Sequence, residues 1–465
     1  MGVRDMKLMD RAKQKALTQM LKLLPKVSDK NLIRLTYLAE RIDYKEGYVE
    51  AIRTIRKAFE EQTTYVVLGK RILTKLSPKC RDKLLTNFFV NSALMGWHFR
   101  SRFNEKEGFM PPYFMVISPT MRCNLKCIGC YAGDYTKGED LDYQTVSRVI
   151  TEGYEMGIHF ITISGGEPFL WGDLLRLFRE HNDVYFQVYT NGTLIDEQMA
   201  KELASLGNVA PSISVEGLEK ETDERRGKGT FARIMKAMEK LKENGVMFGF
   251  SATPTRYNSD LLASEEFIDF YIEKGCFFGW YFQYIPIGRN PDINLMSTPQ
   301  QRNSLRESIS QWRTNKPIFL GDFWNDGPYV GGCIAGGRQY LHINHKGDVE
   351  PCVFTHFAVD NIKDKSLKEI LKSDLFRMIR EKQPYSDNLY APCMIIDNPQ
   401  VLREIVALSG AHPTHQGAET VVSDPRIKAH LDRYAAEMHR LTDSLWEKTR
   451  EEFYFGREQK SQKES

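Results

Sequence analysis

Strand-like and helix-like segments alternate six times between residues 113 and 314, and this alternation constrains the fold more than any other feature. Apolar, strand-like stretches lie at 113–119, 159–164, 184–190, 209–215, 247–253 and 277–284. Helical patterns separate them at 142–156, 172–181, 196–205, 230–244, 262–274 and 299–314. Such alternation is typical of a parallel sheet whose strands are joined by crossover helices. The sequence therefore predicts an α/β fold with the sheet curled into an open, partial barrel, whose open side would admit large substrates.

Three further segments flank this predicted barrel, which we place at residues 111–316. Residues 1–110 are expected to be helical, up to the break at Pro111-Pro112. Residues 317–400 lose the alternation and predict a small α+β domain, and residues 401–465 predict a helical extension. A chain of 465 residues has length for two to three domains.

Three closely spaced cysteines follow the first predicted strand. They are Cys123, Cys127 and Cys130, in the pattern C-x3-C-x2-C. Thiolates hold iron–sulfur clusters, and three local cysteines would leave one iron of a [4Fe–4S] cube free to bind a small molecule. Structural zinc usually takes four ligands as two separated pairs, and disulfides are rare in a reduced compartment. The spacing therefore favours an open cluster over both alternatives.

Polar groups follow the next predicted strands where each of them ends. Gly165-Gly166-Glu167-Pro168 follows the second strand, Asn191 the third and Glu216 the fourth. Parallel α/β folds place their active sites at the carboxyl ends of the strands. Two adjacent glycines let the backbone approach a ligand closely, and a carboxylate such as that of Glu167 can receive an ammonium group.

These motifs resemble those of radical S-adenosylmethionine (SAM) enzymes, over about residues 113–312. The resemblance implies a (β/α)6 partial barrel, SAM as a cofactor, and a SAM-binding [4Fe–4S] cluster on Cys123, Cys127 and Cys130. The reduced cluster would split SAM into methionine and a 5′-deoxyadenosyl radical, which abstracts hydrogen from an unactivated C–H bond. The protein would orient the cofactor and exclude side reactions.

The same resemblance assigns contacts to SAM. Gly165, Gly166 and Glu167 match the segment that holds the methionine amine, and Arg226 resembles the arginine that meets the carboxylate. Positions that contact the ribose or methionyl part are matched by Asn191, Ser214 and Glu216. Many members of the superfamily carry an aromatic residue near the adenine, just before the third cysteine. This chain has Gly129 there, and we expect Tyr131 to take that place.

A second cysteine set lies in the predicted α+β segment. Cys333-x13-Gly347-x4-Cys352 resembles the opening of the auxiliary-cluster domain called SPASM, or of its shorter relative, twitch. A hairpin formed by residues 340–344 and 348–350 would bring Cys333 and Cys352 together.

Cys393 is the third cysteine of this set, whereas a full SPASM pattern has seven. The resemblance therefore implies one auxiliary [4Fe–4S] cluster on Cys333, Cys352 and Cys393. Its fourth iron would be open, or held by Asp397 or a nearby histidine. The alternative is that these are buried free thiols, which is what we expect of Cys80 and Cys276.

Charge is distributed unevenly along the chain. Residues 1–108 carry 23 Lys/Arg against 12 Asp/Glu, although the net charge of the whole chain is only +3. The basic amphipathic pattern from Met6 to Leu24 predicts contact with an anionic partner, most plausibly a membrane surface, with packing on its own domain as the alternative. No apolar run reaches the ~18 residues that span a membrane, and the N-terminus lacks a secretory h-region. We therefore expect a cytoplasmic protein, with peripheral binding to the inner face of the membrane.

Two hypotheses about the substrate follow from the sequence. The basic helical N-terminal region favours the acyl chain of a membrane lipid, whereas peptide side chains are the usual targets of radical SAM enzymes with auxiliary domains. A maturase-type enzyme is thus the alternative, and a non-catalytic iron–sulfur electron-transfer protein is a third reading. We expect a small reductant protein of flavodoxin or ferredoxin type as partner, and no nucleic acid. Arg289, after the sixth strand, is a candidate substrate contact.

Overall fold

A nine-stranded sheet forms the centre of the computed structural model, which describes residues 19, 28–39, 53, 56–133 and 139–461. The strand order is β7-β6-β5-β4-β3-β2-β1-β8-β9, so β7 and β9 are open edges. Strands β1 to β7 are parallel neighbours in chain order, at Phe114–Ile117, Phe160–Ile163, Tyr185–Thr190, Val209–Val215, Gly249–Ala252, Phe278–Tyr281 and Phe319–Asp322. This arrangement confirms the predicted α/β fold with an open barrel.

The sheet extends beyond the six predicted strands at both edges. The seventh parallel strand, β7, lies where we expected the alternation to stop. Its apolar pattern is interrupted, because Phe319 at its start is half exposed and its last two residues are Gly321 and Asp322. At the other edge, β8 (His342–Ile343) pairs in parallel with β1 and in antiparallel fashion with β9 (Val349–Glu350). The predicted hairpin is therefore present, and it continues the barrel sheet.

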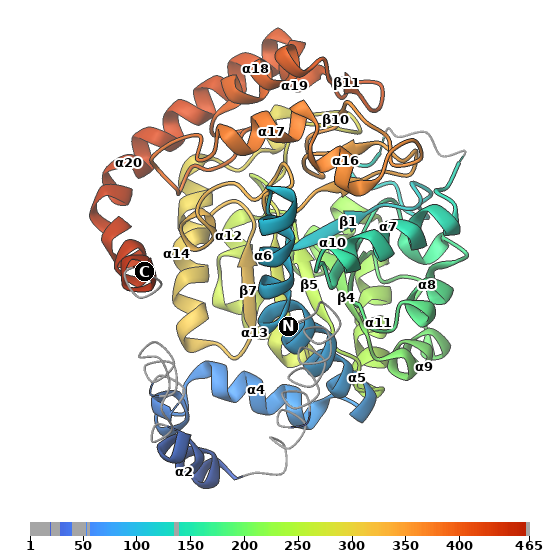
Figure 1. Ribbon diagram of the computed structural model, residues 1–465, viewed down its shortest axis with the longest axis vertical. Helices are drawn as coiled ribbons and strands as arrows, with labels where there is room; N and C mark the ends of the chain where they lie inside the picture. The colour runs from blue at the N-terminus through green and yellow to red at the C-terminus, as the bar shows by residue number, and fades with distance from the viewer. Residues whose placement is uncertain (1–18, 20–27, 40–52, 54–55, 134–138, 462–465) are drawn as a thin grey trace.

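Helices connect the parallel strands as predicted (Figure 1). The crossovers are α7 (Tyr143–Glu155), α8 (Leu174–Glu180), α9 (Glu197–Leu206), α11 (Thr230–Glu243), α13 (Glu265–Lys274) and α14 (Pro299–Asn315). Shorter helices precede some of them: η3 (Pro168–Leu170), α10 (Glu219–Arg226), α12 (Ser259–Leu262) and η4 (Ile293–Leu295). Asp142, Asp196 and Thr298 cap three of the crossovers by accepting a backbone N–H of the first turn, which is the usual role of these residue types at a helix start.

Side chains along each strand alternate between the outer helices and the interior of the barrel. On β3, the ring of Phe186 lies 4.8 Å from that of Phe178 on α8. Its neighbours Gln187 and Tyr185 instead line an internal cavity. The interior of the barrel is therefore formed by one set of alternate residues from each strand.

Helices of the N-terminal region cover the amino ends of the strands. They are α4 (Thr64–Lys75), α5 (Pro78–Lys83) and the π-helix η2 (Leu84–Leu94), with α2 (Asp29–Ala39) farther out. Helix α6 (Gly96–Glu107) instead runs along the sheet toward the C-terminal part of the chain, where Glu107 pairs with Lys372. Arg71 of α4 donates to the carbonyl of Pro317 just before β7, at 2.5 Å. Asn87 of η2 donates to the carbonyl of Val184 just before β3, at 3.1 Å. The amphipathic pattern of Met6–Leu24 lies, apart from Gln19, outside the described residues.

The chain after β7 folds at the opposite end of the molecule from α4 and α5 (Figure 1). Its elements are α15 (Gly327–Val330), β8, β9, β10 (Phe357–Ala358), α16 (Leu367–Leu371), α17 (Asp374–Glu381), α18 (Pro399–Ser409), β11 (His412–Pro413), α19 (Thr420–Ser423) and α20 (Pro425–Ser461). Strands β10 and β11 form a small antiparallel pair. The boundaries at 110, 316 and 400 stay predictions. No helix in the described part of the chain has the length and apolarity to cross a bilayer.

Candidate active site

A cavity of about 1220 Å³ occupies the interior of the barrel. At the carboxyl ends of the strands it is bordered by the cysteine loop that follows β1 and by residues at the ends of β2, β3 and β4. The predicted site residues on its wall are Cys123, Cys127, Cys130, Tyr131, Gly165, Gly166, Asn191, Ser214 and Arg226. The structure thus brings together residues spread over a hundred positions of the sequence.

The two glycines after β2 are required by the close approach of the cysteine loop. A Cβ on Gly165 would lie 2.3 Å from the carbonyl oxygen of Thr120, and one on Gly166 would lie 2.3 Å from that of Arg122. Gly165 also has a φ of +119°, which a side chain rarely tolerates. The Gly-Gly pair therefore seats the cysteine loop against the sheet.

Glu167 lies behind this turn and is completely buried. Its carboxylate accepts hydrogen bonds from the Thr190 hydroxyl (2.7 Å), the Asn191 backbone N–H (2.8 Å) and the Phe169 N–H (3.2 Å). Burial raises the pKa of Glu167, and the donors from Asn191 and Thr190 oppose that rise. Glu167 thus ties the end of β2 to the end of β3, behind the part of the cavity wall that Gly165, Gly166 and Asn191 form.

Two arginines of α10 meet Glu216, which follows β4. Arg226 pairs with Glu216 at 2.5 Å and Arg225 pairs with it at 2.6 Å. Burial lowers the pKa of Arg226, but the Glu216 carboxylate and Cys127 outweigh burial and raise it. Glu216, which we expected to contact the ribose or methionyl part, instead holds two cations at the cavity wall. Arg225 was missed by the sequence reasoning because the adjacent Arg226 alone matched the motif.

Donors surround the sulfurs of the cysteine loop. The Leu125 backbone N–H lies 3.4 Å from Cys123 Sγ, and the Asn191 side-chain amide lies 3.9 Å from it. A guanidinium nitrogen of Arg226 lies 4.0 Å from Cys127 Sγ. Hydrogen bonds to the sulfurs are one of the means by which proteins stabilise and tune clusters. Ser214 contributes its hydroxyl to the same wall, 3.4 Å from that of Ser251.

The aromatic residue beside Gly129 is Tyr284 rather than Tyr131. A Cβ on Gly129 would lie 2.6 Å from the Tyr284 ring. The Tyr131 ring instead packs against Phe354 with centroids 5.3 Å apart, and its hydroxyl lies 2.9 Å from that of Ser164. Burial raises the pKa of Tyr131 to about 12. Tyr284 comes from the loop after β6, far along the chain from Gly129, so the sequence around the cysteines does not predict this contact.

Arg289 also belongs to the cysteine loop rather than to a substrate site. Its guanidinium donates to the carbonyls of Cys127 and Gly133, each at 3.3 Å, and its backbone N–H donates to the Cys130 carbonyl at 3.0 Å. The structure therefore gives Arg289 the role of holding the loop in place.

The second cysteine set surrounds a buried region next to the same cavity. Burial and the nearby Cys333 together raise the pKa of the Cys352 thiol to about 12. The Tyr340 hydroxyl donates to Cys352 Sγ at 2.8 Å, and the Ile395 N–H donates to Cys393 Sγ at 3.3 Å. Phe354, which packs against Tyr131, follows Cys352 by two residues. An aromatic pair thus lies between the two cysteine sets.

Asp397 is engaged elsewhere and does not offer a free carboxylate to this set. It forms a buried, two-point ion pair with Arg302 of α14, at 2.6 and 3.1 Å. It also accepts the Cys393 N–H at 3.0 Å. The prediction that Asp397 supplies a fourth ligand conflicts with this geometry, because the carboxylate already neutralises a buried arginine.

The thiol groups of both cysteine sets are of the kind that holds iron–sulfur clusters. In the described part of the chain, no three His, Cys, Asp or Glu side chains converge as ligands of one metal ion would. A [4Fe–4S] cube takes each thiolate on a different iron, so its cysteines stand apart. The donors around their sulfurs fit the negative charge that thiolates would carry.

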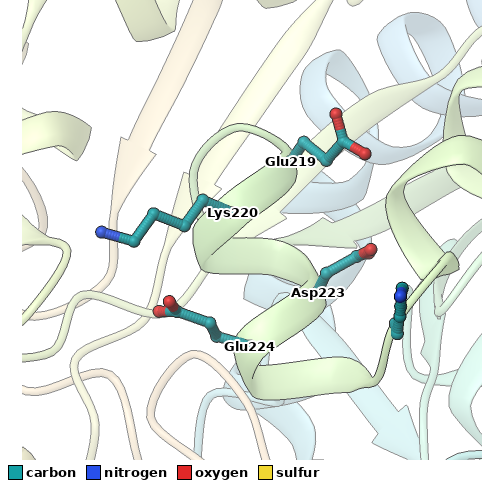
Figure 2. A pocket seen from close by; sticks show the side chains of 5 residues that line it. Glu219, Lys220, Asp223 and Glu224 are labelled. Atoms are coloured by element: carbon teal, nitrogen blue, oxygen red, sulfur yellow. The ribbon is translucent and has the colours of Figure 1, made fainter.

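A shallower hollow on the outer face of α10 lacks side chains that converge on a common point. Figure 2 shows that its labelled side chains, Glu219, Lys220, Asp223 and Glu224, spread to different sides of the helix. Asp223 accepts the backbone N–H groups of Gly229 and Phe231, at 2.6 and 2.8 Å. Its role is to fix the start of α11, and we assign no site there.

Comparison with known proteins agrees with this geometry. Residues 117–255 match the model of the radical SAM superfamily, and residues 333–394 match that of SPASM, an iron–sulfur cluster-binding domain. The AdoMet-dependent heme synthase of Oleidesulfovibrio alaskensis is 28% identical, over 57% of this chain and 76% of that protein. The mycofactocin maturase MftC of Mycolicibacterium smegmatis is 29% identical, over 60% of this chain and 75% of that protein.

Among solved structures, that of Streptococcus suis SuiB bound to its precursor peptide SuiA has the same fold. The two structures match over 81% of this chain and 90% of the SuiB chain, with a TM-score of 0.54 at 19% sequence identity. The predicted cofactors are thereby confirmed: SAM, a SAM-binding [4Fe–4S] cluster and an auxiliary cluster. The chain thus contains a radical SAM domain followed by a SPASM domain, the two domains of a radical SAM enzyme with an auxiliary cluster.

Proposed function

We propose that this enzyme reductively cleaves SAM and abstracts hydrogen from an unactivated C–H bond of a substrate held in the barrel cavity. The observation that carries this proposal is the meeting of Cys123, Cys127 and Cys130 with the Gly165–Glu167 turn at one end of a large cavity. A non-catalytic electron-transfer protein needs the cysteines, but it has no use for a ligand cavity beside them.

The chain's own residues hold and orient the reactants. We assign cluster binding to Cys123, Cys127 and Cys130, and SAM binding to Gly165, Gly166, Glu167, Asn191, Ser214 and Arg226, with Tyr284 in place of Tyr131 beside Gly129. When bound, the reduced cluster supplies the electron that splits SAM into methionine and the hydrogen-abstracting 5′-deoxyadenosyl radical. Glu216 positions Arg225 and Arg226, and the buried Glu167 keeps the ends of β2 and β3 in register.

Cys333, Cys352 and Cys393 are assigned to the auxiliary cluster. Their region borders the same cavity through Tyr340, Val353 and Phe354. A cluster held by these cysteines would serve to take up the electron left after product forms, or to contact substrate. A small reductant protein of flavodoxin or ferredoxin type is our proposed electron donor.

The substrate class is not fixed by the reaction. Relatives named mycofactocin maturase and PqqA peptide cyclase, and the SuiB complex with a precursor peptide, support the peptide reading over an acyl chain. Relatives of similar identity are named AdoMet-dependent heme synthase and Fe-coproporphyrin III synthase. The lining of the cavity gives a separate argument about the substrate class.

The test compares two triple variants after anaerobic reconstitution. Replacing Cys123, Cys127 and Cys130 by alanine should abolish 5′-deoxyadenosine formation with dithionite, and should lower the iron content from about eight to about four per chain. Replacing Cys333, Cys352 and Cys393 should remove the other four irons yet leave uncoupled SAM cleavage. Cys80→Ala is the matched control, because Cys80 lies in the core, away from both sets. Undiminished SAM cleavage in the first variant would refute the proposal.

A further inference from the structure

The barrel cavity is larger than the SAM site requires. Its volume of about 1220 Å³ exceeds the roughly 300–1,000 Å³ of an ordinary small-molecule pocket. The cysteines, Ser164 and Arg226 border only one end of it. The rest runs along the barrel to the amino ends of the strands, where α4 and η2 cover it.

The wall of this remote half is apolar. Leu68 and Ile72 of α4 and Phe88 of η2 face Phe114 at the start of β1, Phe160 at the start of β2, and Met247 before β5. The rings of Phe88 and Phe160 lie 5.3 Å apart. At the starts of the strands the Tyr185 hydroxyl is buried without a hydrogen-bond partner. Farther along the barrel, Thr162 of β2 and Gln187 of β3 also line the cavity.

The remote half opens to solvent between α4, η2 and β7. Five of the residues that line the cavity are exposed, and three of them mark this mouth. These three are Tyr65 of α4, which is 62% exposed, Phe89 of η2 at 38% and Phe319 of β7 at 50%. The other two, Tyr329 at 55% and Val330 at 37%, belong to α15. The mouth therefore has an aromatic rim, at the end of the barrel away from the cysteines.

The chemistry of the wall discriminates between a peptide and a hydrocarbon chain. Each peptide residue other than proline brings one N–H and one C=O that need partners when water is excluded. The wall formed by α4, η2 and the first residues of the strands provides almost none, apart from the hydroxyls of Tyr65 and Tyr185. A polymethylene chain needs no partners, and its burial against aliphatic and aromatic side chains is favourable. The lining thus suits a hydrocarbon chain.

We propose that the remote half of the cavity binds the extended hydrocarbon chain of an acyl lipid, which enters at the Tyr65–Phe89–Phe319 mouth and reaches toward the cysteine end. This inference rests on the proposed function, because it names the substrate class of the same cavity. It makes the acyl chain, and not a peptide segment, the part of the substrate that lies inside the barrel.

Gly69 of α4 provides the test, because it lines the cavity and a Cβ placed there would meet no atom within 4 Å. A larger side chain at this position therefore starts from open space on the cavity wall and takes up cavity volume. The probe is palmitate, measured by its displacement of a fluorescent 18-carbon fatty acid from the reconstituted enzyme. Wild type should bind palmitate, and Gly69→Phe should weaken binding at least tenfold.

Two variants serve as matched controls. Gly69→Ala makes the same change of backbone freedom without the volume, and Gly172→Phe adds the same ring at an exposed glycine where a Cβ also meets nothing within 4 Å. Both should bind palmitate as wild type does. The proposal is overturned if wild type does not bind palmitate, if Gly69→Phe binds it unchanged, or if an apolar octapeptide displaces the probe and palmitate does not.

Uncoupled SAM cleavage by the same proteins separates this inference from the proposed function. It should be unchanged in Gly69→Phe, because Gly69 lies at the amino end of the barrel. Palmitate binding that depends on Gly69, in a wild-type enzyme that cannot cleave SAM, would refute the proposed function and leave the chain-binding site standing. SAM cleavage by a wild-type enzyme that does not bind palmitate would refute the chain-binding site and leave the proposed function standing.

Discussion

Gly129 and Tyr284 illustrate how two distant residues share one place in the site. The absent side chain at position 129 leaves the space that the Tyr284 ring occupies, 2.6 Å from where a Cβ would stand. The backbone N–H of Asp292 donates to the Tyr284 hydroxyl at 3.0 Å, which fixes the ring. The ring lines the cavity beside the cysteine loop, so we expect it to contact the adenine of SAM.

Replacing Tyr284 by alanine should therefore weaken SAM binding about two- to tenfold, because an aromatic pair contributes about 0.5–1.5 kcal/mol beyond its buried area. Tyr284→Phe keeps the ring and should bind SAM almost as wild type does. Equilibrium dialysis of the reconstituted enzyme with labelled SAM measures both. Equal affinity in wild type and Tyr284→Ala would place the adenine elsewhere, and Tyr131→Ala would then be the next variant to measure.

Local spacing explains which site residues could be predicted. Cys123, Cys127 and Cys130 lie within eight positions, and the Gly165–Glu167 turn directly follows a strand, so both leave a signal in the sequence. The roles of Glu216 and Tyr284 depend instead on partners brought close by tertiary packing. Their chemistry alone, a carboxylate and a phenol after a strand, cannot say whether they face a ligand or another side chain.

At the scale of elements, helix α14 anchors the C-terminal part of the chain to the barrel. Its Arg302 is fully buried and pairs with Asp397, close to Cys393. It also donates to Asn325 at 2.9 Å. Removing one partner of a buried pair leaves an uncompensated charge, which typically costs about 3–5 kcal/mol.

Arg302→Met should consequently destabilise the fold by about 3–5 kcal/mol and reduce the auxiliary iron, because Asp397 would no longer be held beside Cys393. Iron content and thermal unfolding measure the two effects. Arg377→Met on α17 is the control, since Arg377 is 50% exposed and forms only surface pairs, worth about 0–1 kcal/mol. A full iron complement in Arg302→Met would show that the ion pair does not support the auxiliary site.

Continuity of the apolar pattern decided which parts of the sheet were predictable. The six predicted strands lie in apolar stretches, and the helices between them carry recognisable caps such as Asp142 and Thr298. Strand β7 has four residues, as β1 does, but half of them are Gly321 and Asp322, and β8 has only two residues. These two strands owe their place to neighbours: β7 to β6, and β8 to β1. No pattern within their own residues reveals those pairings.

At the scale of the whole molecule, the positive charge of the chain is concentrated in residues 1–108, with 23 Lys/Arg against 12 Asp/Glu. The described helices of this region surround the mouth of the cavity through Tyr65 and Phe89. A basic region beside an aromatic mouth suits an anionic membrane surface, where each nearby Lys or Arg contributes about 1 kcal/mol and salt weakens the attraction.

We expect the enzyme to sediment with anionic vesicles at low salt, less at high salt, and little with neutral vesicles. Deleting residues 1–24 should weaken this binding and leave uncoupled SAM cleavage intact, because the site motifs lie beyond Tyr113. Vesicle sedimentation at two salt concentrations measures the effect. Full-length protein that ignores anionic vesicles at low salt would show that the basic N-terminal region does not bind membranes.

The pairing of β8 with β1 has a practical consequence for anyone who shortens the chain. Val116 and Ile117 of β1 lie opposite His342 and Ile343, so the C-terminal hairpin shields the backbone of the first barrel strand. A fragment that ended after β7 would leave a row of unpaired N–H and C=O groups along β1. Exposed edges of this kind recruit strands from other molecules. The isolated barrel should therefore aggregate, even though every residue assigned to SAM binding would still be present in it.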